Sequence, residues 1–182
     1  MNIILQTERL LLREIEPEDD VALFELDADP EVHRYLGNKP VQRIEDIREV
    51  ITFIRWQYTE YGIGRWAVIE KETDEFAGWS GLKYITNDWN GHINFYDVGY
   101  RLLPRHWGKG YATESARAAV AYGFEQLQAA TIYGTAHVEN TRSRNALQKC
   151  GLRYIESFEH EGMPCDWLKI SREEWEAMEA GR

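Results

Sequence analysis

The segment from Ile93 to Val138 constrains the fold more than any other part of this chain. It begins with the strand pattern "INFYDVGYRLL" (93–103), turns through two glycines around Lys109, continues as an apolar helix pattern over 110–127 and ends with the strand pattern "TIYGTAHV" (131–138). A strand, a helix and a second strand in this order predict a crossover unit whose two strands are parallel. The chain is therefore expected to fold around a sheet that carries helices.

The glycine turn inside this unit predicts an anion site. Gly108 and Gly110 let the backbone turn with its N–H groups facing one space, and the N-terminus of the following helix also attracts negative charge. The turn follows the first strand of the unit, at the end where α/β sheets usually bind ligands. A turn without any ligand is the alternative. Two other phosphate motifs are excluded, because no Ser or Thr follows Lys109 as in a P-loop, and because Thr113 stands where a dinucleotide fingerprint requires glycine.

The rest of the chain alternates between strand and helix patterns. Short polar turns join the strands in the middle of the chain, so antiparallel neighbours are expected there. The predicted architecture is one α/β domain over residues 1–182, with flanking helices and a mixed, mostly antiparallel sheet of about seven strands. Besides the crossover unit, strands are expected at 8–15, 65–71, 75–85, 152–159 and 165–171, helices at 17–29, 44–61 and 143–150, and a short helical turn at 30–37.

The composition excludes several classes of function. With 21 Lys and Arg against 31 Asp and Glu, the net charge of -10 argues against nucleic acid as a partner. The same charge suits a cationic substrate, although solubility alone explains an acidic surface equally well. The first residues include charged side chains by position 8 and no run of 18 apolar residues occurs, so a cytoplasmic protein without a membrane partner is expected. The two cysteines and five scattered histidines lack metal-site spacing, and no metal is expected.

Five motifs, in order and at similar separations, resemble the GCN5-related N-acetyltransferases (GNAT), in the branch of the Rim-type ribosomal-protein alanine acetyltransferases. They are "TERLLLR", "DVGYRLLP", the "ATE" helix start, "ENTRS" and "KCGL", and "RHWGKGYA" is similar to the family's Gln/Arg-x-x-Gly-x-Gly/Ala segment. The resemblance implies acetyl-CoA as cofactor, with the strands 93–103 and 131–138 splayed apart to admit its pantetheine arm. It also implies an amine acceptor, either a protein N-terminus or a small cationic amine, and leaves monomer and homodimer open.

The resemblance identifies the anion at the glycine turn as the pyrophosphate of coenzyme A. Backbone N–H groups around the turn would bind it, and Arg105 and Lys109 would add charge, although Lys109 is equally explained as a solvated surface residue. The pantetheine amides would pair with the strand end as an added strand does. Asn140 and Ser143 match the family's Asn-x-x-Ser/Ala, with helix capping as the alternative. The complete expected cofactor set is Leu102, Leu103, Arg105, Trp107, Gly108, Lys109, Gly110, Tyr111, Ala112, Asn140 and Ser143.

Asp97 is the first candidate for the catalytic base when an amine attacks the thioester directly. It stands where the Rim group carries Glu or Asp. A base matters because a lysine-like amine with a pKa near 10.4 is neutral only about one part in a thousand at neutral pH. The alternatives are an ion pair with an arginine such as Arg101, or a role as anchor for the amine. Glu159, His160 and Glu161, in the turn that runs to Pro164, are second candidates, with solvated turn charge as the alternative.

One position departs from the family pattern. Many members carry a tyrosine that protonates the departing thiolate, and Leu147 occupies that position here. Ser143 is then the nearest expected hydroxyl, in a hydrogen-bonding role. A non-catalytic module that binds acyl-CoA as a sensor or partner is the alternative function for the whole chain. Trp89 and Trp167 are expected either in the core or in the wall of an acceptor pocket.

Overall fold

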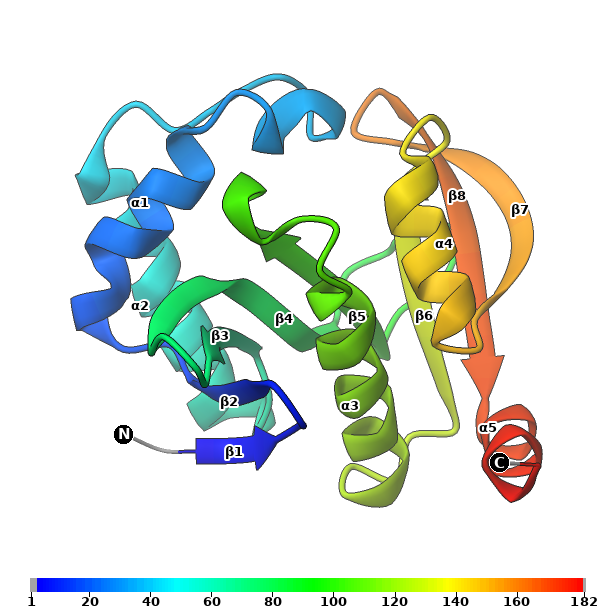
Figure 1. Ribbon diagram of the computed structural model, residues 1–182. Helices are drawn as coiled ribbons and strands as arrows, with labels where there is room; N and C mark the ends of the chain where they lie inside the picture. The colour runs from blue at the N-terminus through cyan, green and yellow to red at the C-terminus, as the bar shows by residue number, and fades with distance from the viewer. Residues whose placement is uncertain (1–2, 182) are drawn as a thin grey trace.

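The computed structural model describes residues 3–181, and in it a single eight-stranded sheet has helices on both faces (Figure 1). The strands lie in the order β1-β2-β3-β4-β5-β6-β8-β7. They are β1 (Ile3–Gln6), β2 (Leu10–Glu14), β3 (Arg65–Glu70), β4 (Glu75–Ile85), β5 (Phe95–Leu102), β6 (Thr131–His137), β7 (Arg153–His160) and β8 (Met163–Ser171). The helices are α1 (Asp20–Ala28), α2 (Ile44–Tyr61), α3 (Tyr111–Glu125), α4 (Thr141–Lys149) and α5 (Arg172–Ala180), with 3-10 turns η1 (Pro17–Asp19), η2 (Val32–Tyr35) and η3 (Pro104–His106).

The predicted crossover unit is confirmed, because β5 and β6 are parallel neighbours joined through α3. Every other neighbouring pair in the sheet is antiparallel. The parallel pairing covers only Tyr96 opposite Ile132 and Asp97 opposite Tyr133. Beyond Asp97 the two strands separate, and Figure 1 shows them diverging on either side of the start of α3.

Alternate residues of β3 pack against different helices, and this shows which helices cover each face of the sheet. Trp66 and Val68 belong to the same buried cluster as residues of α3 and α4, whereas Ala67 and Ile69 pack with α1 and α2. Side chains on a strand alternate between faces, so α3 and α4 cover one face and α1 and α2 the other. A Cβ at Gly123 of α3 would lie 2.7 Å from side-chain carbons of both Leu82 and Ile132, so this close helix contact requires glycine.

Two elements were missing from the sequence prediction, which therefore gave about seven strands instead of eight. Strand β1 is a short, partly exposed edge strand without strict alternation, and helix α5 buries none of its residues. Apolar residues in α5 recur with a helical period as strong as that of α2, and the capping box of Ser171 and Glu174 is a readable start signal, so α5 could have been predicted from the sequence. The predicted end of α2 is confirmed at Gly62, which is left-handed at φ 67°. No helix within residues 3–181 is long and apolar enough to cross a membrane.

Candidate functional site

The diverging part of β5 offers backbone groups to the space between the strands. The N–H of Leu103 donates to Ala77 O of β4 at 2.9 Å, so by the alternation of an antiparallel ladder Val98, Tyr100 and Leu102 direct theirs toward β6. The Leu102 carbonyl accepts a hydrogen bond from the Trp107 indole at 2.7 Å. Leu102 and Leu103 were both predicted to pair with an arm of a ligand. Of the two, Leu102 is the one whose N–H points toward the space between the strands.

Both backbone groups of Leu103 have a partner among the described residues, because its carbonyl also accepts from the N–H of His106 at 2.9 Å. This second bond closes η3, the turn that leads from β5 into the glycine segment. Leu103 therefore fixes the position of the turn rather than facing the space between the strands.

The glycine segment 108–112, called the cradle below, leaves a run of backbone N–H groups without an acceptor among the described residues at the start of α3. Gly110 is the N-cap of α3 at φ 86°, and Gly108 has φ 75°. Within the part of the chain that is described, the N–H groups from Gly108 to Ala112 donate no hydrogen bond to any other group. A Cβ at Gly108 would meet nothing within 4 Å, so the surface above it is open. This arrangement suits an anion such as a phosphate.

Both predicted cations of the cradle face carboxylates. Arg105 pairs with Glu25 at 2.5 Å, and the two side chains are 47% and 55% exposed. Lys109 Nζ lies 3.2 Å from the buried Glu70. Hydrogen bonds from Tyr111, Thr73 and Lys109 lower the pKa of Glu70 to about 2. Arg105 is thus in an exposed ion pair, which costs little to break. Lys109 and Tyr111 instead both contact the buried Glu70 of β3.

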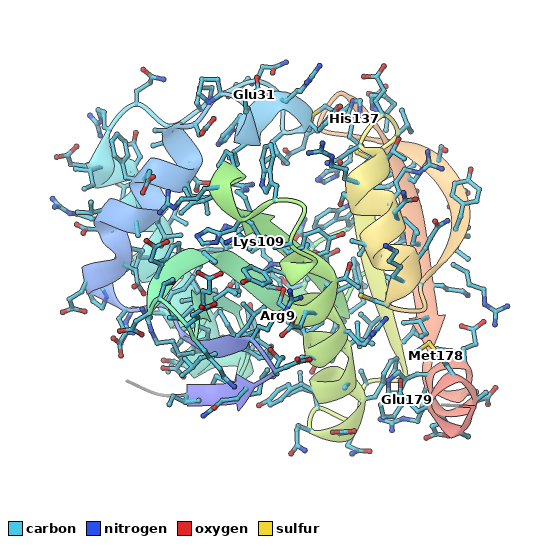
Figure 2. All side chains as sticks on the ribbon, in the orientation of Figure 1. Arg9, Glu31, Lys109, His137, Met178 and Glu179 are labelled. Carbon is cyan, nitrogen blue, oxygen red and sulfur yellow. The ribbon has the colours of Figure 1, made fainter. Side chains whose placement is uncertain are left out.

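Arg9 is a cradle residue that was not predicted from the sequence. Its guanidinium donates to the carbonyl of Lys109 at 2.9 Å, pairs with Glu114 at 2.6 Å and lies 4.7 Å from the ring centre of Tyr111. Figure 2 shows Arg9 and Lys109 beside the start of α3. Arg9 belongs to the "TERLLLR" motif, which was the available signal. The N-terminal strand pair therefore stabilises the backbone of the cradle.

On the β6 side of the space, Asn140 caps α4, because its Oδ1 accepts from the N–H of Ser143 at 3.1 Å. Tyr100 of β5 reaches the same turn, where its hydroxyl donates to Ser143 O at 2.7 Å and lies 3.2 Å from Ser143 Oγ. Burial raises the pKa of Tyr100. Leu147 is buried in the core. Tyr100 is thus a hydroxyl next to Ser143 that the sequence did not predict.

Asp97 lies where β5 and β6 part, and it is 4% exposed. Its Oδ2 accepts from Arg65 Nη2 at 2.5 Å, whereas Oδ1 has no hydrogen-bond partner within the described residues. The expected alternative partner, Arg101, instead pairs with Asp27 at 2.6 Å. Burial raises the pKa of Asp97, and the charge of Arg65 acts against this shift. The site therefore contains a buried carboxylate with one oxygen unsatisfied.

His160, the last residue of β7, acts on Asp97 from the other side, since a positive charge there lowers the pKa of the carboxyl group. His160 stacks on Trp89 at 4.3 Å between ring centres, and Trp89 lies 6.5 Å from Trp167. Both predicted tryptophans thus belong to one aromatic cluster beside Asp97, which also includes Tyr133, stacked on Trp167 at 4.8 Å. Glu159 and Glu161, the candidates on either side of His160, are exposed.

These features follow one another along β5 and the start of α3. The N–H cradle lies at one end, the free backbone edge of β5 runs beside the diverging space, and Asp97 lies where the strands meet. An elongated ligand with an anionic end at α3 would bring its other end toward Asp97 and the aromatic cluster.

Comparison with known proteins shows the family to which the chain belongs. The family described as acetyltransferase (GNAT) domain matches residues 9–153. The chain is 36% identical to "Uncharacterized N-acetyltransferase p20" of Bacillus licheniformis over 91% of this chain and 87% of that protein. It is 30% identical to "FsC-acetyl coenzyme A-N(2)-transacetylase" of Aspergillus fumigatus over 96% and 79% of the two chains. A GNAT-family acetyltransferase structure from Bacillus anthracis superposes with a TM-score of 0.76 at 27% identity, covering 95% of this chain and 99% of that one.

Proposed function

Because this chain belongs to the GNAT acetyltransferase family and is an acetyl-CoA-dependent acyltransferase, we propose that it acetylates a primary amine that binds at Asp97. The observation that carries the proposal is the unpartnered Oδ1 of this buried carboxylate, located where β5 and β6 separate. An unsatisfied buried acceptor is costly, and a donor from a bound amine would satisfy it. The family membership itself speaks against a non-catalytic acyl-CoA sensor.

The cradle residues fit the pyrophosphate of coenzyme A. The N–H groups from Gly108 to Ala112 would bind it, and Arg105 would leave Glu25 to join it. This exchange is inexpensive, because an exposed ion pair contributes at most about 1 kcal/mol. Leu102 would pair with the pantetheine arm through its backbone. When bound, acetyl-CoA supplies a thioester carbonyl that an amine attacks.

Asp97 would act on the amine in two ways. Its Oδ1 would accept an N–H of the incoming ammonium and then take the proton, directly or through a water molecule, so that the nitrogen becomes a nucleophile. A pKa raised by burial improves Asp97 as a proton acceptor at neutral pH. In the alternative, Asp97 binds the ammonium through the same oxygen but does not take its proton.

A small cationic amine is the acceptor that the site supports best. Asp97 is 4% exposed, so a slender alkylammonium reaches it more easily than an α-amine on a branched carbon. The rings of Trp89 and Tyr133 both lie against Trp167 in the aromatic cluster, and aromatic rings favour a cation, as does the net charge of -10. A protein N-terminus is the second candidate, and it is supported by the Rim-type motifs.

Loss of the thiol would rely on hydrogen bonding rather than on a strong acid. Leu147 provides no hydroxyl, and Ser143 and Tyr100 lie 3.2 Å apart through their hydroxyl oxygens at the first turn of α4. Ser143, held in place by Tyr100, would donate to the departing sulfur. A thiolate with a pKa of about 8.5 leaves readily enough for this weak assistance to suffice.

A thiol-release assay across a panel of amines tests the proposal. The panel comprises linear polyamines and alkyl diamines, peptides with free N-termini, and a control without amine that measures hydrolysis. The expected result is fast release with the small cationic amines and slow release with the peptides. A preference for peptides would mean that the acceptor is a protein N-terminus and not a small cationic amine. No release above hydrolysis with any amine would contradict the proposed reaction.

A further inference from the structure

We infer that Arg65 is a positioning residue for Asp97: it binds one carboxylate oxygen and fixes the group so that the other oxygen is presented to the acceptor. The inference rests on the proposed function of Asp97. Arg65 is the first residue of β3, two strands away from Asp97 in the sheet. Its role is therefore created by strand register and not by proximity in the sequence.

The guanidinium of Arg65 is anchored on the backbone before it reaches the carboxylate. Nη1 donates to Gly81 O at 2.5 Å and to Asp97 O at 2.7 Å, while Nη2 donates to Asp97 Oδ2 at 2.5 Å. The side chain of Arg65 is only 11% exposed. Because the same guanidinium holds the main chain and the side chain of Asp97, the carboxylate has little freedom to rotate, and Oδ1 keeps its direction.

The path of Arg65 over the sheet depends on a glycine. Arg65 lies opposite Gly81, and Gly81 lies opposite Gly99 in the neighbouring pair of strands. A Cβ at Gly99 would lie 2.8 Å from Arg65 Nη2, which is closer than real Cβ contacts allow. Glycine at 99 therefore leaves the space that the guanidinium occupies.

Among the charges around Asp97, Arg65 has the largest effect in lowering the pKa of its carboxyl group. Burial raises the pKa of Asp97, and the opposing influences are Arg65 first, then Lys83 opposite Asp97 on β4, then His160 at the end of β7. Burial also lowers the pKa of Lys83, and the charge of Arg65 adds to this effect. Tyr100, on the same strand, responds to the charge of Asp97. Removal of Arg65 would thus leave the effect of burial on Asp97 largely unopposed.

A purely structural ion pair would also explain the contact, and Arg101 provides the matched control. Arg101 pairs with the buried Asp27 at 2.6 Å, and its guanidinium lies 5.1 Å from the ring centre of Trp79, where Arg65 lies at 5.3 Å. Arg65→Gln and Arg101→Gln each remove a guanidinium from the same aromatic ring and from one buried aspartate. The first change should affect the titration of Asp97 much more than the second, because Arg101 acts on the charge of Arg65 but does not contact Asp97.

The test is a carbon-13 NMR titration of aspartate-labelled protein without acetyl-CoA, in which the Asp97 carboxyl signal is identified by its loss in Asp97→Asn. Arg65→Gln should raise the pKa of Asp97 by about one to three units, since a charged partner at this distance shifts a carboxylate by that much. Arg65→Lys, which keeps the charge, should raise it less. A titration of Asp97 in Arg65→Gln that matches Arg101→Gln would overturn the inference.

Two further measurements separate the possible failures. If Arg65→Gln does not fold, Gly99→Ala displaces the same guanidinium and should also raise the pKa of Asp97, and no change there overturns the inference. If Asp97→Asn acetylates amines at the native rate, the proposed role of Asp97 fails and with it any positioning role of Arg65. If Asp97→Asn is inactive while the Arg65 variants leave the titration unchanged, the inference about Arg65 fails alone.

Discussion

Replacing Gly110 by valine should weaken acetyl-CoA binding, whereas the same replacement at Gly62 should not. Both glycines have a left-handed backbone conformation: φ is 86° for Gly110 at the N-cap of α3 and 67° for Gly62 after the end of α2. A side chain in this left-handed region costs about 1–2 kcal/mol or more. A protein of this size loses about 2–4 °C of melting temperature per kcal/mol. Both variants should therefore fold and melt about 2–8 °C lower.

The difference should appear in the affinity for the cofactor. At Gly110 a Cβ would approach Arg9 Nη2 to 3.3 Å, and relief of the strain would turn the neighbouring N–H groups out of the cradle, whereas at Gly62 a Cβ meets nothing within 4 Å. One lost hydrogen bond to a charged group is worth about 1.5–3 kcal/mol. The dissociation constant measured by calorimetry should thus rise at least about tenfold for Gly110→Val. Equal affinities in the two variants would refute the cradle.

Three other results are expected. Acetyl-CoA at about 100 times its Kd should stabilise the protein by about 2.7 kcal/mol, seen as a rise in melting temperature, and an unchanged melting temperature would exclude the cofactor. Tyr100→Phe should lose about 0.5–1.5 kcal/mol in urea unfolding, because the bond to Ser143 O disappears; no loss would mean that this contact is not formed in solution. The lowered pKa of Glu70 should give stability that is present above about pH 4.5 and lost as the pH falls toward 2, so Glu70→Gln should flatten this acid limb in unfolding curves, and an equally steep limb would contradict the network around Glu70.

The parts of the fold that could be predicted are those that local sequence determines. The crossover from β5 through α3 to β6 follows from periodicity and the glycine turn, and the end of α2 follows from Gly62. The cradle was also predictable, because its N–H groups belong to consecutive residues at the start of one helix.

The partners of the candidate site could not be predicted, because strand register brings them together. Arg65 and Asp97 are 32 residues apart and meet only because Gly81 and Gly99 align between them. Arg9 reaches the carbonyl of Lys109 across 100 residues. The sequence suggested Arg101 as a partner for Asp97 because it is near in the strand, but Arg101 is taken by Asp27.

The rate of acetyl transfer by Asp97→Asn, measured against pH beside the native protein, tests the central claim most directly. The matched control is Asp27→Asn, which removes a buried aspartate from an arginine pair outside the proposed site. We predict that Asp97→Asn lowers kcat/KM about a hundredfold or more at pH 7, and that its rate recovers toward the pKa of the amine, where neutral amine forms unaided. Asp27→Asn should keep the native profile. An Asp97→Asn rate within a few-fold of native at pH 7, or a pH profile parallel to the native one, would contradict the assignment of Asp97 as the group that takes the proton.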